Sequence, residues 1–508
     1  MDLGLWTIAA AEPDRVALVD PDGREVGYGE LAAKANRYAL GLRELGLEVG
    51  DAIVLLLPNG DELLAAYFAA IQTGLYVVVV NWHLVGPEVA YILTDSGAKA
   101  FLAHERFADV AVAAADEAGL TARFAVGDVP GFRRLEELGA GLGDGRPLAR
   151  TAGSPMLYTS GTTGRPKGVR RPLTGADPDE VPAASTWFFG IFGLAPFDGH
   201  VHLCGSPLYH TAVLNFVAIS VQLGHTAVLM DRWDAAEMLR LIERHRVTHS
   251  HMVPTQFRRL LALPDDVRAE FDLSSLRVMI HGAAPCPLEV KRRMLDWWGP
   301  VVTEYYAATE GGGTVITGED WLRKPGSVGL PWPGSTVRVL DPSGAEVPPG
   351  SVGTVYLKMG DSSFEYHRDS AKTARSRVGS LFTLGDIGHL DPDGYLYLHD
   401  RAADLIISGG VNIYPAEIEG ELVMHPKIAD VAVFGVPHED WGEEIKAVVQ
   451  PAPGVSPSAA LTSELLAFAA TRLARFKLPR SVDYLEELPR DPNGKLYKRR
   501  LRERYVES

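Results

Sequence analysis

The chain has 508 residues, and its 46% hydrophobic and 22% charged residues are typical of a globular protein. That length exceeds one ordinary hydrophobic core, so at least two domains are expected. The formal net charge of −16 argues against nucleic acid or an anionic membrane as the main partner. The two cysteines, Cys204 and Cys286, predict buried thiols rather than a disulfide framework, and they suit a reducing cytoplasm.

Helical and strand patterns alternate from the beginning of the chain. Apolar spacing predicts helices over residues 28–45 and 62–71, and strands over 52–57 and 75–80. The apolar stretch 63–80 is interrupted by Gln72-Thr73-Gly74, so a membrane span is not expected. The alternation predicts an α/β fold with buried, largely parallel sheets.

Two changes in composition divide the rest of the chain. Residues 174–182 are polar and contain two prolines, which predicts a surface loop. Near residues 394–404, short strands with turns give way to a smaller αβ unit, with helices predicted over 416–423 and 459–474 and a strand over 431–435. We place a domain boundary close to Arg401. The prediction is a large N-terminal domain of several subdomains, residues 1–400, followed by a small α+β domain, residues 401–508.

Residues 158–168 read Tyr-Thr-Ser-Gly-Thr-Thr-Gly-Arg-Pro-Lys-Gly. Glycine lets the backbone N–H groups approach an anion closely, and the hydroxyls and the lysine add donors and positive charge. The string is not a Walker A loop, because the required Lys-Ser or Lys-Thr after glycine is missing. It predicts a phosphate-binding loop made of Thr159, Ser160, Gly161, Thr162, Thr163, Gly164 and Lys167.

This string resembles the phosphate-loop signature of the adenylate-forming superfamily of acyl-CoA synthetases, adenylation domains and luciferases. The resemblance continues in order along nearly the whole chain. It implies an ATP-dependent ligase of the fatty-acid or aromatic-acid branch, which forms an acyl-adenylate and pyrophosphate and then acyl-CoA and AMP. Its implied cofactors are ATP, Mg²⁺ and coenzyme A, and its implied substrate is a carboxylic acid.

The resemblance also assigns the nucleotide site. Residues 281–285 resemble the adenine-side loop, with Gly282, Ala283 and Ala284 against the base. Residues 304–310 resemble the Tyr-Gly-x-Thr-Glu motif, in which Tyr306 stacks on adenine, Thr309 contacts the α-phosphate and Glu310 holds Mg²⁺. Asp386 and Arg401 resemble the ribose-binding pair. Here Ala307 replaces the usual glycine of that motif, and its methyl group bears on the size of the acyl pocket.

Three further motifs resemble the mobile C-terminal part of the family. Residues 408–419 contain Gly409 and Gly410, and the glycine that matches Gly410 lines the pantetheine tunnel. Ala403 occupies the hinge position, which is normally Lys or Asp, and a small residue is compatible with rotation. Residues 491–495 resemble the motif that supplies the catalytic lysine, here Lys495, which bridges the carboxylate and the α-phosphate.

The acid itself is expected beside an apolar wall. Residues 207–211 resemble the family motif whose His or aromatic residue meets the acid, which assigns His210 to substrate contact. Residues 187–197 are aromatic and apolar, and Val213, Leu214 and Phe216 continue that character. A metal site at His245, His249 and His251 is disfavoured, because no His-Glu-x-x-His pattern is present.

Three alternatives stay open at this point. The acceptor could be the phosphopantetheine of a carrier protein. The fold could adenylate another oxyacid or use its adenylate with an amine. The chain could be a non-catalytic nucleotide sensor, against which the intact Glu310, Arg401 and Lys495 argue. The expected partners are the acid and coenzyme A. Neither nucleic acid nor an integral membrane association is expected, and a homodimer is left open.

Overall fold

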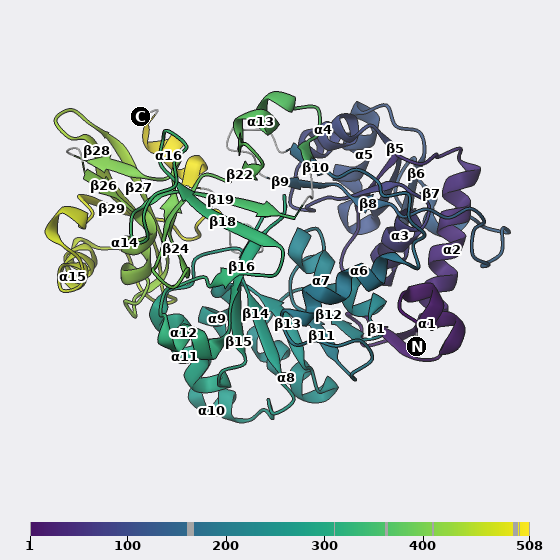
Figure 1. Cartoon of the computed structure of the whole chain (residues 1–508), viewed down its shortest axis with the longest axis horizontal. Helices are drawn as coiled ribbons and strands as arrows, with labels where there is room; N and C mark the ends of the chain where they lie inside the picture. Colours follow the sequence, from purple (N-terminus) through teal and green to yellow (C-terminus); the bar gives the residue numbers. More distant parts are fainter. Residues whose placement is uncertain are drawn as a thin grey trace. The chain divides into compact units, whose positions relative to one another are not determined.

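The computed structural model describes residues 2–159, 167–308, 310–360, 364–408, 411–490, 496 and 498–506. The chain divides into two compact units. Their helices and strands are labelled in Figure 1. The first unit comprises Met1–His251, Asp265–Ile280 and Ser363–Arg375, and the second comprises Met252–Pro264, His281–Ser362 and Ser376–Ser508. The smaller helices and those that connect the sheets are α1 (Leu5–Ala11), α6 (Val181–Gly190), α8 (Ala235–His245), α10 (Asp265–Ala269), α12 (Gly318–Arg323) and α13 (Ser370–Arg375).

The first unit contains a six-stranded sheet in the order β7-β6-β5-β3-β4-β8. All its pairings are parallel. The strands are β3 (Ala52–Leu56), β4 (Tyr76–Val79), β5 (Ala98–His104), β6 (Arg123–Val126), β7 (Arg133–Arg134) and β8 (Ser154–Pro155). The predicted mixed α/β class with buried parallel strands is therefore confirmed for this layer.

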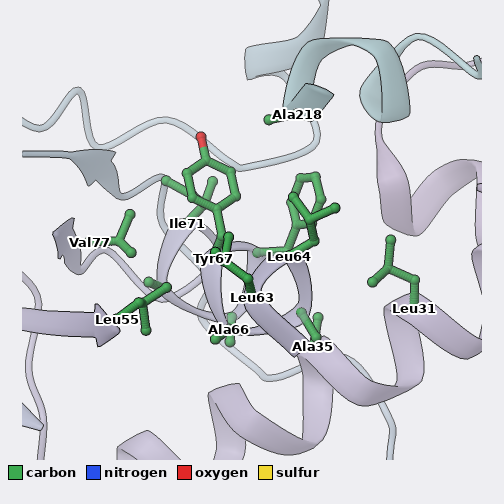
Figure 2. Packing of buried hydrophobic residues seen from close by; sticks show 14 of the residues in the cluster. Leu31, Ala35, Leu55, Leu63, Leu64, Ala66, Tyr67, Ile71, Val77 and Ala218 are labelled. Carbon is green, nitrogen blue, oxygen red and sulfur yellow. The ribbon is translucent and has the colours of Figure 1, made fainter. Parts of the chain in front are cut away.

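Alternate residues of β3 enter two separate hydrophobic cores. Leu55 packs with one pair of helices, whereas its neighbour Val54 packs with another pair. Because successive side chains of a strand point to opposite faces, one apolar run serves both layers. Figure 2 shows the first core, where Leu55 and Val77 meet Leu63 and Tyr67. The first pair of helices is α2 (Tyr28–Glu44) and α3 (Asp61–Ile71), and the second is α4 (Gly86–Ser96) and α5 (Ala108–Glu117).

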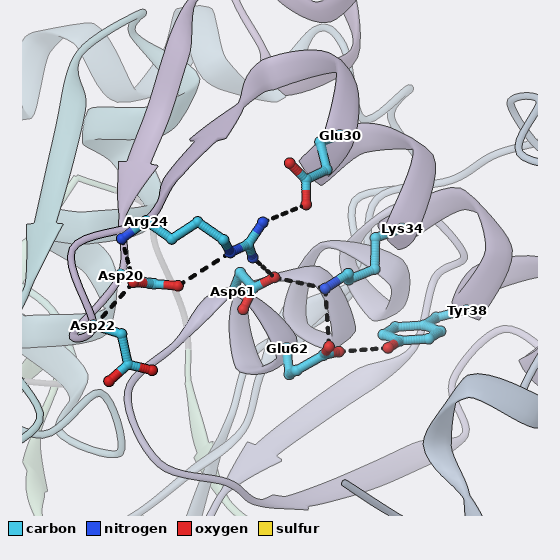
Figure 3. Close-up of polar contacts among 8 residues, drawn as sticks. All are labelled: Asp20, Asp22, Arg24, Glu30, Lys34, Tyr38, Asp61 and Glu62. Carbon is cyan, nitrogen blue, oxygen red and sulfur yellow. Dashed lines mark hydrogen bonds and ion pairs between the residues drawn. The ribbon is translucent and has the colours of Figure 1, made fainter.

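The N-terminus of α3 is held by a network of ion pairs (Figure 3). Lys34 of α2 donates to Asp61 at 2.6 Å and to Glu62 at 2.9 Å. Arg24 joins the network through Asp61 at 2.8 Å and Glu30 at 2.7 Å. Carboxylates in the first turn complement the positive end of the helix dipole, so the network stabilises the junction of α2 and α3.

Two more sheets lie in the first unit. One contains the order β14-β13-β11-β12-β1-β2; β12 pairs in parallel with β1 and β11, β11 pairs in parallel with β13, and β1 and β2 form an antiparallel hairpin. The other is the three-stranded sheet β20-β10-β9. The strands are β1 (Val16–Val19), β2 (Glu25–Gly27), β9 (Leu157–Thr159), β10 (Lys167–Arg170), β11 (Val201–Cys204), β12 (Thr226–Leu229), β13 (His249–Met252), β14 (Val278–His281) and β20 (Glu365–Tyr366), and helix α7 (Thr211–Gln222) packs on β11 and β12.

The second unit begins with helices α9 (Pro254–Leu261) and α11 (Leu288–Trp298) and the strands β15 (Val302–Ala307), β16 (Gly313–Ile316) and β17 (Leu330–Pro331). An antiparallel sheet follows in the order β21-β22-β19-β23-β24, with β18 paired to β19. Its strands are β18 (Ser335–Leu340), β19 (Gly353–Met359), β21 (Arg377–Val378), β22 (Leu381–Phe382), β23 (Asp386–Leu390) and β24 (Leu396–Arg401).

The C-terminal part of the second unit has its own sheet, β26-β25-β28-β27, with β29 parallel to β28. Its core joins Ile406, Ile418 and Leu465. The elements are β25 (Ile406–Ser408), β26 (Val411–Ile413), β27 (Ile428–His438), β28 (Gly442–Pro451), β29 (Ser481–Tyr484), α14 (Pro415–Leu422), α15 (Ala459–Ala470) and α16 (Lys498–Val506).

Three elements differ from the sequence expectations by more than one residue at an end. Helix α6 begins at Val181, inside the expected loop, because a proline in the first helical turn leaves no hydrogen bond unmade. Helix α15 ends at Ala470 rather than at residue 474. Strand β27 is longer than expected at both ends, since β28 pairs with it from Ile428 to His438. Residues 498–506 form α16 at the end of the described chain.

Both thiols are free. Cys204 is buried, and burial raises the pKa of its thiol to about 12. Cys286 is half-buried, and burial together with Glu304 raises its pKa. Neither thiol is poised to act as a nucleophile at neutral pH. Among the helices of the described ranges, none is long and apolar enough to cross a membrane.

Candidate nucleotide-binding site

The two ends of the predicted phosphate loop are paired. Thr159 ends β9 and Lys167 begins β10, and the two residues are opposite one another in this antiparallel hairpin. Tyr158 anchors the first strand, because its hydroxyl donates to Asp95 Oδ2 at 2.7 Å. The intervening candidates Ser160, Gly161, Thr162, Thr163 and Gly164 lie outside the described residues. The prediction that this segment binds phosphate therefore stands on its sequence and on the pairing of its ends.

His210 occupies the N-cap position of α7, also in the first unit. Its ring centroid lies 4.3 Å from that of Tyr209, which in turn meets Trp82 edge-on at 4.8 Å. His210 is partly exposed, whereas Tyr209 is 7% exposed. The histidine is thus held at a helix N-terminus by aromatic neighbours, and its contact with an acid stays a prediction.

The apolar segments proposed to line the acid pocket do pack against each other. Phe216 of α7 is 1% exposed, and its ring lies 5.5 Å from Phe188 and 5.7 Å from Phe192. The ring of His251 stacks on Phe216 at 5.1 Å. Trp187, at the edge of this cluster, is 43% exposed. These contacts make one aromatic wall of residues that the sequence had named separately.

The predicted adenine loop follows β14 and belongs to the second unit. A Cβ atom on Gly282 would lie 2.8 Å from the carbonyl oxygen of Tyr305, so only glycine fits there. Ala283 has φ of +68°, a left-handed conformation that costs a residue with a Cβ about 1 kcal/mol. Such strain is concentrated at functional sites. Ala283 is also exposed, so the strained loop is open to a ligand.

Tyr306, Asp386 and Arg401 form one contiguous polar group in the second unit. The Tyr306 hydroxyl donates to Asp386 Oδ2 at 2.6 Å, and Arg401 Nε lies 3.3 Å from Asp386 Oδ1. Asp386 is opposite Arg401 in the β23–β24 hairpin, which explains their proximity. Burial and the Asp386 charge raise the pKa of Tyr306, so its hydroxyl stays protonated. The predicted adenine and ribose residues are thus in contact.

Ala307 and Glu310 flank the turn that follows β15. Ala307 is opposite Gly313 in the β15–β16 pairing. Glu310 is 6% exposed and close enough to Tyr306 to raise its pKa. A buried carboxylate beside the adenine-stacking candidate suits a hard cation such as Mg²⁺ carried on the nucleotide phosphates. Thr309, between them, lies outside the described residues.

A buried ion pair supports this site, and the sequence reasoning missed it. Lys291 of α11 is 0% exposed and donates to Glu304 Oε2 on β15. His281, just before the adenine loop, lies 3.6 Å from the same oxygen. Glu304 is two residues before Tyr306, so the pair holds together the strand and the loop that carry the adenine-binding candidates. The only sign of this ion pair in the sequence is that Lys291 lies at helical spacing among the apolar residues 290, 294 and 295.

Replacing Lys291 by methionine should destabilise the protein by about 3–5 kcal/mol, because it leaves the Glu304 carboxylate buried without its partner. The midpoint of urea unfolding should fall for this variant and stay unchanged for Lys99→Met, which removes an exposed lysine. Replacing both partners, Lys291→Met with Glu304→Gln, should recover most of the loss. An unchanged midpoint for Lys291→Met alone would contradict the buried pair.

The remaining site candidates lie in the C-terminal part of the chain. Ala403 is exposed in the turn between β24 and β25, where Asp404 N–H donates to the Arg401 carbonyl at 3.0 Å. Gly409, Gly410 and Lys495 lie outside the described residues. The residues that bracket the lysine segment, Arg490 and Leu496, form an antiparallel β-bridge. The roles of all four positions stay predictions.

Two family models match the chain. Residues 5–364 match the AMP-binding enzyme model, and residues 417–495 match the model of the AMP-binding enzyme C-terminal domain. The chain therefore belongs to the AMP-binding enzyme family, and the resemblance inferred from its motifs is confirmed. The gap between the two matched ranges contains the expected domain boundary, which stays a prediction at Arg401.

Particular relatives extend over nearly the full chain. A feruloyl-CoA synthase of Amycolatopsis is 36% identical over 99% of both chains. The fatty acid–[acyl-carrier-protein] ligase ScoC of Streptomyces coeruleorubidus is 33% identical over 95% of this chain and 92% of its own. The crystal structure of ATP-bound MatB from Rhodopseudomonas palustris is 31% identical, with a TM-score of 0.83 and 99% coverage of each chain.

Proposed function

We propose that this chain is an ATP-dependent carboxylic acid–CoA ligase that forms acyl-AMP and pyrophosphate and then acyl-CoA and AMP. The single observation that carries the proposal is the contact of Tyr306 with Asp386 and of Asp386 with Arg401. An aromatic face, a carboxylate acceptor and a guanidinium in one group suit a nucleoside, and they occur in a family of AMP-binding enzymes.

In the proposed first step, each residue has a separate task. Tyr306 stacks on adenine, Asp386 accepts from the ribose hydroxyls, and Arg401 adds a charge-assisted bond. Segment 159–167 cradles the phosphates and Glu310 would hold their Mg²⁺, while Thr309 contacts the α-phosphate. The acid carboxylate attacks the α-phosphorus and pyrophosphate leaves, with Lys495 stabilising the charge that develops.

In the proposed second step, the C-terminal part pivots at Ala403, withdraws Lys495 and brings Gly410 beside the adenylate. The coenzyme A thiolate attacks the acyl carbon, the bond from that carbon to the phosphate oxygen breaks, and AMP leaves. The acid lies against His210 and the aromatic wall around Phe216. That wall favours an apolar acyl chain or ring, and the methyl group of Ala307 bears on the size of the acyl pocket.

The acceptor and the acid are tested together by one screen. Pyrophosphate release is measured with short-, medium- and long-chain fatty acids and with aryl acids. Thioester formation is then measured with coenzyme A and with a phosphopantetheinylated carrier protein. We expect pyrophosphate release with an apolar acid and a thioester with coenzyme A. A thioester formed with the carrier protein alone would show that the chain loads a carrier protein instead. ATP binding with no pyrophosphate release from any acid would show that the chain is a nucleotide sensor.

The proposal includes a cytoplasmic location, since both thiols are free and the reaction uses cytoplasmic ATP and coenzyme A. Self-association as a homodimer stays a prediction, which sedimentation velocity of the purified chain will decide.

A further inference from the structure

Strand β24 holds the beginning of α14 through a hydrogen bond from the backbone of the helix to a side chain of the strand. Asp400 Oδ2 accepts the backbone N–H of Ala416 at 2.9 Å, in the first turn of the helix. Tyr414 at the N-cap position makes no side-chain cap of its own, and Pro415 has no N–H to satisfy. Asp400 therefore supplies, from outside the helix, the acceptor and the negative charge that a helix N-terminus requires.

A stack of rings makes a second contact between the same two elements. His399 stacks on Tyr414, with ring centroids 5.2 Å apart and planes at 29°. His389 on β23 also contacts His399, through stacking at 5.0 Å and through a hydrogen bond of 3.0 Å between His389 Nδ1 and His399 Nε2. Tyr397 stacks on His389 at 4.9 Å. Burial and then His389 lower the pKa of His399, so the ring of His399 is uncharged at neutral pH.

Each contact joins residues that lie on opposite sides of the proposed hinge in the sequence. His399 and Asp400 precede Ala403 by four and three residues, whereas Tyr414 and Ala416 follow it. The strand that supplies both contacts also carries Arg401, which is paired with Asp386 in the candidate ribose site. A rotation of the chain at Ala403 moves α14 relative to β24, and it must break both contacts.

Helix α14 is in turn connected to the tail of the chain. Glu419 accepts from Lys498 Nζ at 2.9 Å, and the exposed fractions of these side chains are 19% and 13%. Glu419 also accepts the backbone N–H of Val433 at 2.7 Å, which fixes its orientation. Lys498 is the first residue of α16 and follows the segment that contains Lys495 by three residues. The position of α14 therefore bears on the position of the tail.

We propose that Asp400 and His399 are positioning residues for adenylation, which hold α14 on the strand of the ribose site through a helix cap and a ring stack. The inference rests on the proposed two-step reaction and on the hinge at Ala403. Neither residue contacts the reacting atoms in this proposal. They act by holding the C-terminal part in the orientation that the lysine-assisted first step requires, and they release it for the second.

The test uses two pairs of matched variants in the full-length chain. Asp400→Ala removes the cap, whereas Asp400→Asn keeps an acceptor oxygen at the same place. His399→Ala removes the ring, whereas His399→Phe keeps a ring that can stack on Tyr414. Each variant is assayed in two half-reactions: acid-dependent pyrophosphate release, and acyl-CoA formation from a synthetic acyl-adenylate. Because the two contacts are independent, one alanine variant that fails to fold leaves the other as the test.

We expect each alanine variant to slow pyrophosphate release about 5- to 10-fold, as the loss of a cap or of a ring stack implies. The Asn and Phe variants should stay within about threefold of wild type, and acyl-CoA formation from the adenylate should change less than about twofold in all four. Equal loss in both half-reactions, unchanged pyrophosphate release, or failure of Asn and Phe to restore the rate would overturn the inference. A wild-type chain that releases no pyrophosphate with any acid would instead overturn the proposed function, and the inference with it.

Discussion

Replacing Lys495 by alanine is expected to lower acid-dependent pyrophosphate release by about 10²- to 10³-fold, the usual loss when one transition-state charge stabiliser is removed. The reason is electrostatic, because the α-phosphorus gains negative charge on its equatorial oxygens as the carboxylate attacks. Lysine supplies a compact positive charge that alanine cannot replace. The measurement is the single-turnover rate of pyrophosphate release with saturating acid and MgATP.

Two controls make the result specific to that step. Lys427→Ala removes another lysine of the C-terminal part, which is paired only on the surface with Glu464, and it should leave the rate unchanged. Acyl-CoA formation from a synthetic adenylate should persist in Lys495→Ala, because the α-phosphorus chemistry is already complete. Pyrophosphate release at the wild-type rate in Lys495→Ala would remove this lysine from the mechanism.

Acid is expected to unfold the first unit at a pH well above the pKa of most carboxylates. Five histidines, whose exposed fractions are 3% or less, gather around β11 and β13 behind the aromatic wall. The rings of His202 and His249 lie 4.8 Å apart, and those of His200 and His225 lie 5.0 Å apart. The fifth, His251, stacks on Phe216. Protonation places like charges side by side in an apolar layer.

The direction of the effect follows from the pKa values. Burial lowers the pKa of His202 to about 3, and it lowers those of His225 and His251 to about 4. The unfolded chain binds these protons near pH 6.5, so stability is full above that pH and falls progressively below it. Within this window, each such histidine lowers the free energy of unfolding by about 1.4 kcal/mol per pH unit. Three of them therefore lower it by on the order of 5 kcal/mol between pH 6 and pH 4.5.

The His202→Leu variant tests the origin of this acid sensitivity. Among the described residues, neither ring nitrogen of His202 has a hydrogen-bond partner, so leucine removes a titrating group without breaking a bond. Unfolding followed by tryptophan fluorescence should show that the variant loses less stability than wild type between pH 6 and pH 4.5. His83→Gln, at an exposed position, should titrate like wild type. If His202→Leu unfolds with the unaltered pH dependence, the buried histidines are not the cause.

Much of the fold could be predicted from local patterns. The run around Val54 and Leu55 is apolar at every position, and such a run is typical of a parallel strand covered on both faces. The helices over residues 28–44 and 61–71 followed from their apolar spacing. The full length of β27 could not be predicted, because β28 determines it by pairing across a turn that carries no pattern of its own.

The candidate site could likewise be predicted only in part from the sequence. Tyr306, Asp386 and Arg401 were identified by motifs, since adenine and ribose recognition need particular side-chain types. Their contact depends on the β23–β24 register and on the turn after β15, which bring together residues 80 positions apart. Lys291 carried no motif, because a buried lysine and a surface lysine look alike in a sequence. His399 and Asp400 were not singled out for α14 for the same reason.

By itself, the sequence of this protein determined its family, its α/β class and the chemical types gathered for a nucleotide, because glycine, hydroxyl, carboxylate and lysine motifs act over a few neighbouring residues. Only the tertiary structure decided which charges are buried, which rings stack and which strand holds α14. Those properties depend on the partners that each side chain meets across long sequence separations. The free energy of burying a charge or capping a helix exists only once those partners are in place.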